Sequence, residues 1–133
     1  MTTFVEEFFT YLSAGGTTAG TRFYPNALPQ RVELPACRYF MVSNPTERTM
    51  SGSSSLRHPR YQMEFYADGD DGYLDAVKLA NEVIALIDGY VGLMGTVTVY
   101  AGFREETHRD NFDPELNRHW VNMDVTIWHK KPS

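Results

Sequence analysis

Residues 60–88 read RYQMEFYADGDDGYLDAVKLANEVIALID, and the spacing of apolar side chains changes within this stretch. Apolar and polar residues first alternate, as is typical of a half-buried β-strand over residues 60–67. The acidic and glycine-rich segment 68–72 then ends the strand and offers residues that can cap a helix. The apolar side chains that follow at steps of three and four are Tyr73, Val77, Ala80, Ile84 and Ile87. This period predicts an amphipathic helix over residues 73–88.

Further elements are predicted on both sides of this unit. Phe4, Phe8 and Leu12 lie at helical spacing and Thr3 and Glu6 have capping-box separation, so a first helix is expected over residues 3–14. Three prolines keep residues 21–35 extended, so the first true strand is expected only after Pro35. Strands are predicted over residues 36–43, 96–103 and 120–128, the last two from alternating apolar residues.

The order of helix, strands, helix and strands indicates one α+β domain over residues 1–133. We expect an antiparallel sheet of four to five strands with two helices packed on one face. Residues 44–56 contain Pro45, Gly52 and three serines, which predicts a flexible loop. Residues 104–118 are predicted to be a charged connection.

Composition excludes several classes of protein. The chain is 42% hydrophobic and 22% charged, as in ordinary globular domains, and its net charge of −5 argues against a role in coating nucleic acid. No stretch reaches the roughly 20 apolar residues of a membrane span, and the first residues do not resemble a signal peptide. The single cysteine, Cys37, fits a cytosolic place of synthesis.

The sequence carries no complete catalytic or ligand-binding motif. Gly15 and Gly20 have phosphate-loop spacing but lack the required lysine. The aspartates of residues 68–71 do not follow a calcium loop, and the four histidines lack short metal-ligand spacing. No nucleophilic serine motif is present. We therefore expect no catalytic residue, no metal and no cofactor.

The second face of the predicted sheet carries aromatic side chains where a monomer normally exposes polar ones. These residues are Tyr66, Tyr100, Trp120 and Trp128. Aromatic residues with a polar tip are enriched at protein interfaces, so they predict a self-association surface. Burial of one or two of them beneath loops is the alternative.

Several short motifs, in their order and spacing, resemble a known family. They are RFYP at 22–25, LPQ at 28–30, LPA at 34–36, YQMEF at 61–65, LIDGY at 86–90, residues 110–118 and MDV at 123–125. Together they are similar to the tail-completion, or tail-terminator, proteins of long-tailed bacteriophages, over nearly the whole chain.

The resemblance implies an α+β subunit that forms a ring, expected to be a hexamer, at the head-proximal end of the tail tube. The ring would stop tube polymerisation and join tail to head, with DNA passing through it non-specifically. The implied partners are further copies of the chain, the tail-tube protein and a head-tail connector or neck protein, in a virion assembled in the host cytoplasm. A neck or head-closure protein is one alternative, and a monomeric small-molecule-binding domain is another.

Two further site predictions concern docking and charge. Met50 and Leu56 are expected to anchor residues 44–56 when a neighbouring protein docks on this segment. Residues 68–88 contain six acidic residues and the single Lys78, and Asp75 and Glu82 share one stripe of the second helix. These two carboxylates are candidate linings of a DNA channel, and a solvated outer helix face with favourable charges near its N-terminus is the alternative.

Overall fold

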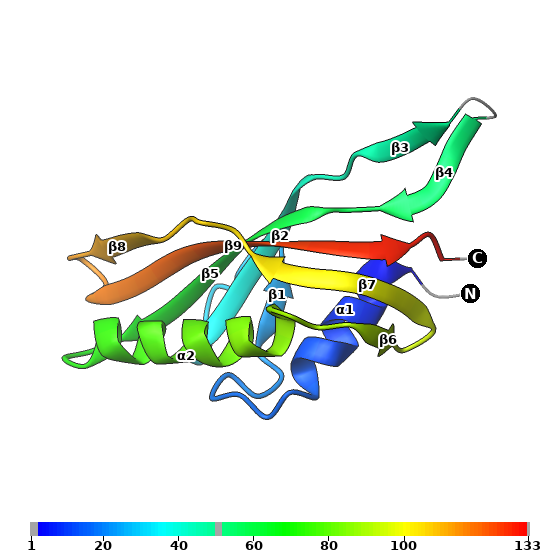
Figure 1. The fold of residues 1–133 in the computed structure, drawn as a ribbon. Helices are drawn as coiled ribbons and strands as arrows, with labels where there is room; N and C mark the ends of the chain where they lie inside the picture. Colours follow the sequence, from blue (N-terminus) through cyan, green and yellow to red (C-terminus); the bar gives the residue numbers. More distant parts are fainter. Residues whose placement is uncertain (1–2, 50–51, 133) are drawn as a thin grey trace.

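The computed structural model describes residues 3–49 and 52–132 and shows two helices and one large sheet (Figure 1). The elements in chain order are α1 (Phe4–Ser13), β1 (Phe23–Pro25), β2 (Ala36–Ser43), β3 (Thr46–Thr49), β4 (Gly52–Arg57), β5 (Arg60–Asp68), α2 (Gly72–Ile87), β6 (Gly92–Met94), β7 (Val97–Arg104), β8 (Arg109–Asp113) and β9 (Arg118–Lys130). The α+β class is confirmed. Within the described residues no helix is long and apolar enough to cross a membrane.

The 13-residue strand β9 is the central strand of the sheet and pairs with β4, β5, β7 and β8. One edge of β9 pairs with β5 and, beyond it, with β4, and the other edge pairs with β8 and then β7. One path of paired strands through the sheet is β1-β2-β5-β9-β4-β3. Strands β7 and β8 pair with β9 outside this path, and β6 pairs with β7. All described pairings are antiparallel except that of β1 with β2.

The sheet has nine strands in the described part of the chain, so the prediction of four to five is wrong. The additional strands are short and lie on or beyond the edges of the long ones. Strand β1 also precedes Pro35, contrary to expectation, although its place at the sheet edge agrees with its proline. Residues 109–113, predicted as part of a charged connection, form β8 on the edge of β9.

Residues 44–56 also differ from the predicted loop. Strands β3 and β4 pair as an antiparallel hairpin, which projects from the body of the molecule in Figure 1. Serine and threonine carry no apolar alternation, but their backbones pair as readily as any others. Met50 lies outside the described residues.

Both helices pack on the same face of the sheet, as predicted. Helix α1 begins with the expected capping box, in which the Thr3 hydroxyl accepts from the Glu6 N–H at 3.2 Å. Phe8 of α1 packs against Tyr39 and Tyr61 of the sheet, with ring centroids 5.7 and 5.0 Å apart. Helix α2 covers β5, β9 and part of β7. We call the opposite face of the sheet the outer face.

Two details of helix α2 differ from expectation. Its buried stripe comprises Gly72, Ala76, Leu79, Ala80, Val83, Ile84 and Ile87. Tyr73, predicted to face the core, is instead 40% exposed. Asp71 occupies the N-cap position, but its side chain makes no capping hydrogen bond.

A β-bulge in β7 changes which side chains face the helices. The register against β9 shifts between Val99 and Ala101. Regular alternation with Val97 and Val99 over the predicted strand 96–103 would turn Phe103 toward the core, but Phe103 is 37% exposed. Gly102 is buried in its place, against the end of α2. Its N–H donates to Tyr90 O at 3.0 Å, and its carbonyl accepts from Gly89 N at 2.8 Å.

Candidate interaction surfaces

The first two predicted interface residues, Tyr66 and Trp120, lie side by side on the outer face. They are cross-strand partners of β5 and β9, and their rings stack with centroids 5.5 Å apart. The Tyr66 hydroxyl donates to Glu64 at 2.9 Å, and Glu64 also forms an ion pair with Arg38. Burial, followed by the charge of Glu64, raises the pKa of Tyr66. Both aromatic side chains are half-buried and already have partners within the subunit.

The other two predicted residues, Tyr100 and Trp128, lie near the opposite end of β9. Trp128 is half-buried beneath His58, whose ring stacks on it with centroids 4.1 Å apart and an interplanar angle of 11°. Tyr100 stands at the β7 bulge next to Trp128 and is 48% exposed. At about 3.3 Å per residue, the eight positions from Trp120 to Trp128 span roughly 26 Å. The four aromatic residues thus form two separate groups.

Polar groups occupy the outer face between these two groups. Arg60 donates to Asp124 at 2.9 Å and lies 3.9 Å from Glu105, which also accepts from the Thr126 hydroxyl. The residues that line a cavity of about 220 Å³ here are Gln62, Glu106, Thr107, His108, Arg109, Asn122 and Asp124. This volume is below the range of about 300–1,000 Å³ typical of small-molecule sites. The polar centre does not continue the aromatic surface predicted from sequence.

The remaining predicted site residues have different surroundings. Leu56 is half-buried in β4 and pairs with Lys130 of β9. Asp75 is exposed on α2. Glu82 accepts hydrogen bonds from the Thr18 N–H and hydroxyl at 3.2 and 2.6 Å, and so holds the turn that follows α1. The role of Asp75 and Glu82 in a channel stays a prediction.

Buried titratable groups serve packing. His129 is 3% exposed and stacks on Phe4 of α1, with ring centroids 3.9 Å apart. Desolvation, with a smaller contribution from Arg57, lowers the pKa of this imidazole. Cys37 is fully buried, and desolvation raises the pKa of its thiol well above the usual value. The described residues contain no group of three or more potential metal ligands.

Sequence reasoning missed a third aromatic group at the end of the molecule where α2 begins. His119 of β9 contacts Phe112 of β8, with ring centroids 4.4 Å apart, and Tyr73 of α2, at 6.3 Å. Phe112 is 49% exposed. The three residues come from separate segments: the pairing of β8 with β9 brings Phe112 to His119, and the packing of α2 on the sheet adds Tyr73.

Comparison with known proteins shows a likeness in fold. No family model and no curated protein matches the sequence. Among solved structures, the fold is similar to that of a chain in the virion of a native gene transfer agent particle, with a TM-score of 0.63. The alignment covers 93% of each chain at 10% sequence identity.

Proposed function

We propose that this chain is a structural protein of a phage-like virion and, more specifically, the subunit of a ring that terminates the tail tube at its head-proximal end. The observation that carries the proposal is the likeness in fold to a chain of a gene transfer agent virion over 93% of both chains. The sequence motifs that resemble tail-completion proteins support the same assignment.

The chemistry of the surface is consistent with an assembling subunit that has no catalytic step. Large apolar side chains are exposed in several places, among them Leu74, Leu93 and Leu116, which are 56–67% exposed. Exposed apolar side chains that gather together commonly mark protein contacts. The partners that we propose are further copies in a ring, expected to be a hexamer, the tail-tube protein on one side and a neck or connector protein on the other. DNA would pass through the ring without specific contacts.

Electron microscopy of particles made without this protein tests the proposal. A tail terminator predicts filled heads unattached to tails, together with tail tubes of abnormal and variable length. Detached tails of normal length would instead indicate a neck protein. Complete particles that still deliver DNA would contradict both structural roles. Small-molecule binding in the outer-face cavity would then be the remaining hypothesis.

A further inference from the structure

Two exposed patches of opposite charge lie at opposite ends of strand β9. We call the first the acidic patch. Its centre is the aromatic group of Tyr73, Phe112 and His119, and Leu74 follows Tyr73 with 66% of its surface exposed. Leu116, in the turn between β8 and β9, is 56% exposed. The centre is therefore apolar and accessible.

Acidic side chains surround this centre. They are Asp70, Asp71, Asp110, Asp113 and Glu115. The Asp110 Oδ1 lies 2.7 Å from His108 Nε2, and the Asp110 Oδ2 accepts a hydrogen bond from the Tyr73 hydroxyl at 3.1 Å. Within the described part of the chain, none of the other four forms an ion pair. Asp68 is not counted because Arg118 pairs with it at 3.0 Å.

We call the second surface the lysine patch. Lys130 and Lys131 line a small hollow together with Thr98 of β7, and Leu93 of β6 is the cross-strand partner of Thr98. Leu93 is 67% exposed. Tyr100 and Trp128 continue the patch on the outer face. Tyr100 lies two residues after Thr98 in β7, and Trp128 lies two residues before Lys130 in β9. Neither lysine forms an ion pair with any described residue, so their charge is available to a partner.

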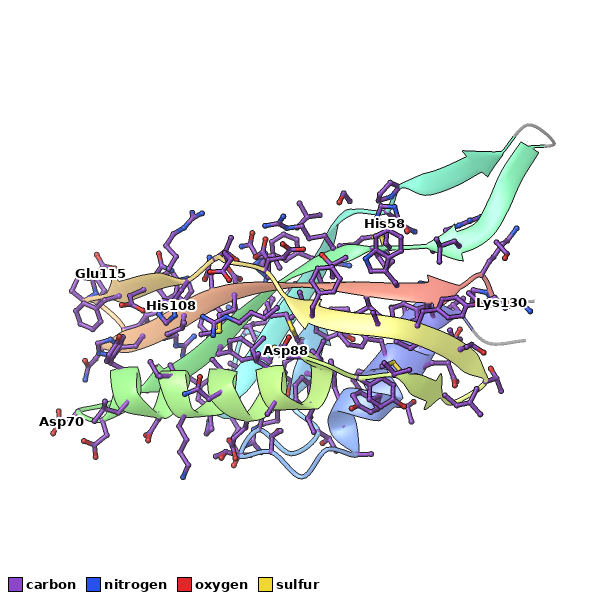
Figure 2. The ribbon with its side chains drawn as sticks, in the orientation of Figure 1. His58, Asp70, Asp88, His108, Glu115 and Lys130 are labelled. Atoms are coloured by element: carbon purple, nitrogen blue, oxygen red, sulfur yellow. The ribbon has the colours of Figure 1, made fainter. Side chains whose placement is uncertain are left out.

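The two patches complement each other in charge and in composition. Each combines exposed apolar or aromatic side chains with charges mainly of one sign, as protein interfaces combine an apolar centre with a polar rim. Figure 2 shows Asp70 and Glu115 at one end of the molecule and Lys130 at the other. At about 3.3 Å per residue, the 13 residues of β9 separate the two ends by roughly 40 Å.

We propose that the acidic patch of one copy docks on the lysine patch of the next copy. Two patches at opposite ends of a subunit cannot contact each other within that subunit. A head-to-tail contact between the patches of neighbouring copies repeats around a ring or along a filament. The aromatic residues supply buried area, and the charges orient the subunits and exclude the reverse contact. The inference rests on the proposed ring function and identifies the surfaces that build the ring.

Charge reversal in the full chain tests this contact. One variant carries Asp70→Lys, Asp71→Lys and Glu115→Lys, which reverses the net charge of the acidic patch, and another carries Lys130→Glu and Lys131→Glu in the lysine patch. All five side chains are exposed and make no described side-chain hydrogen bond. Like charges would then face each other, so each variant should associate at least about tenfold more weakly in low salt. Lys78→Glu, on the exposed side of α2, is the control and should associate as the unmodified chain does.

Light scattering during size-exclusion chromatography gives the outcome. An equimolar mixture of the two reversed variants should assemble again, in rings with even numbers of subunits, because each faulty patch meets its complement. Failure of the mixture to assemble, or assembly of either variant as strong as that of the control, would overturn this contact and leave the ring function standing. An unmodified chain that stays monomeric at every concentration would overturn both.

Discussion

Replacement of Gly102 by alanine probes a close contact between the sheet and the end of helix α2. A Cβ atom at this position would lie 2.5 Å from the carbonyl oxygen of Ile87 and 3.4 Å from the Ile87 Cγ2. The obstructing atom belongs to the backbone at the end of a helix, so it cannot rotate away. The sheet and α2 must therefore separate or the strand must distort.

Overpacking of this kind destabilises folded proteins by about 1–3 kcal/mol. For 133 residues, at about 2.1 cal/mol/K of unfolding entropy per residue, this corresponds to a fall in Tm of roughly 4–11 °C. Thermal unfolding followed by circular dichroism measures the shift. Protein concentration must be low and constant because self-association raises the apparent Tm.

Gly15→Ala is the matched control. Its Cβ atom would meet Leu86 Cδ1 at 2.3 Å, but this methyl group is the end of a flexible side chain and can move, and the nearest backbone atom, the Leu12 carbonyl oxygen, is 3.3 Å away instead of 2.5 Å. The reduced freedom of the unfolded chain further offsets the cost by about 0.4–1 kcal/mol. A Gly15→Ala variant that loses as much stability as Gly102→Ala, or more, would refute the argument from backbone contact.

Three further predictions concern association, pH and charge. Trp128→Ala should weaken self-association by up to about thirtyfold, or 2 kcal/mol, and by more than Trp120→Ala does. Light scattering that shows the larger loss of association for Trp120→Ala would count against the lysine patch. Burial lowers the pKa of His129, so the stability that this neutral imidazole supports is present above the usual pKa of about 6.5 and is lost as the pH falls below it. In urea unfolding, His129→Gln should therefore lose less free energy of unfolding between pH 7 and 5 than the unmodified chain, and identical pH profiles would exclude this cause. Asp75→Lys, which spares the structural contacts of Glu82, should slow DNA ejection from assembled particles most at low ionic strength, and unchanged ejection would remove the channel role.

The long elements could be predicted because their periods are clear. The helices begin and end within one residue of the expected positions, and β2 and β5 lie where alternation and proline boundaries placed them. In these elements one face is buried, so the apolar pattern is strict. The same rule placed the buried face of β9 correctly, with Val121, Met123, Val125 and Ile127 inward.

The short strands could not be predicted because nothing in their side chains requires a sheet. Strands β3, β4 and β8 depend on backbone pairing at the edges of longer strands, which serine, threonine and aspartate permit but do not indicate. The bulge at Tyr100 likewise leaves no mark in an apparently regular alternation. It alone turned Phe103 outward.

The site was predictable only in part for the same reason. Alternation along one face of the sheet predicted a single surface of Tyr100, Trp128, Tyr66 and Trp120. The structure places the first two next to the proposed lysine patch and the last two in a separate group with its own partners. The acidic patch combines α2, β8 and β9, and Phe112 lies in a segment that appeared to be a connection. Such a surface can be recognised only once the pairing of the strands is known.

Cryo-electron microscopy of intact particles assembled in cells that produce this protein is the decisive test of the proposed ring. We expect a closed ring of this chain between the tail tube and the head, with neighbouring subunits joined between Glu115 and Asp70 on one copy and Lys130 and Lys131 on the next. Absence of the chain from the particle, or its presence only in the capsid shell or at the far end of the tail, would contradict the account.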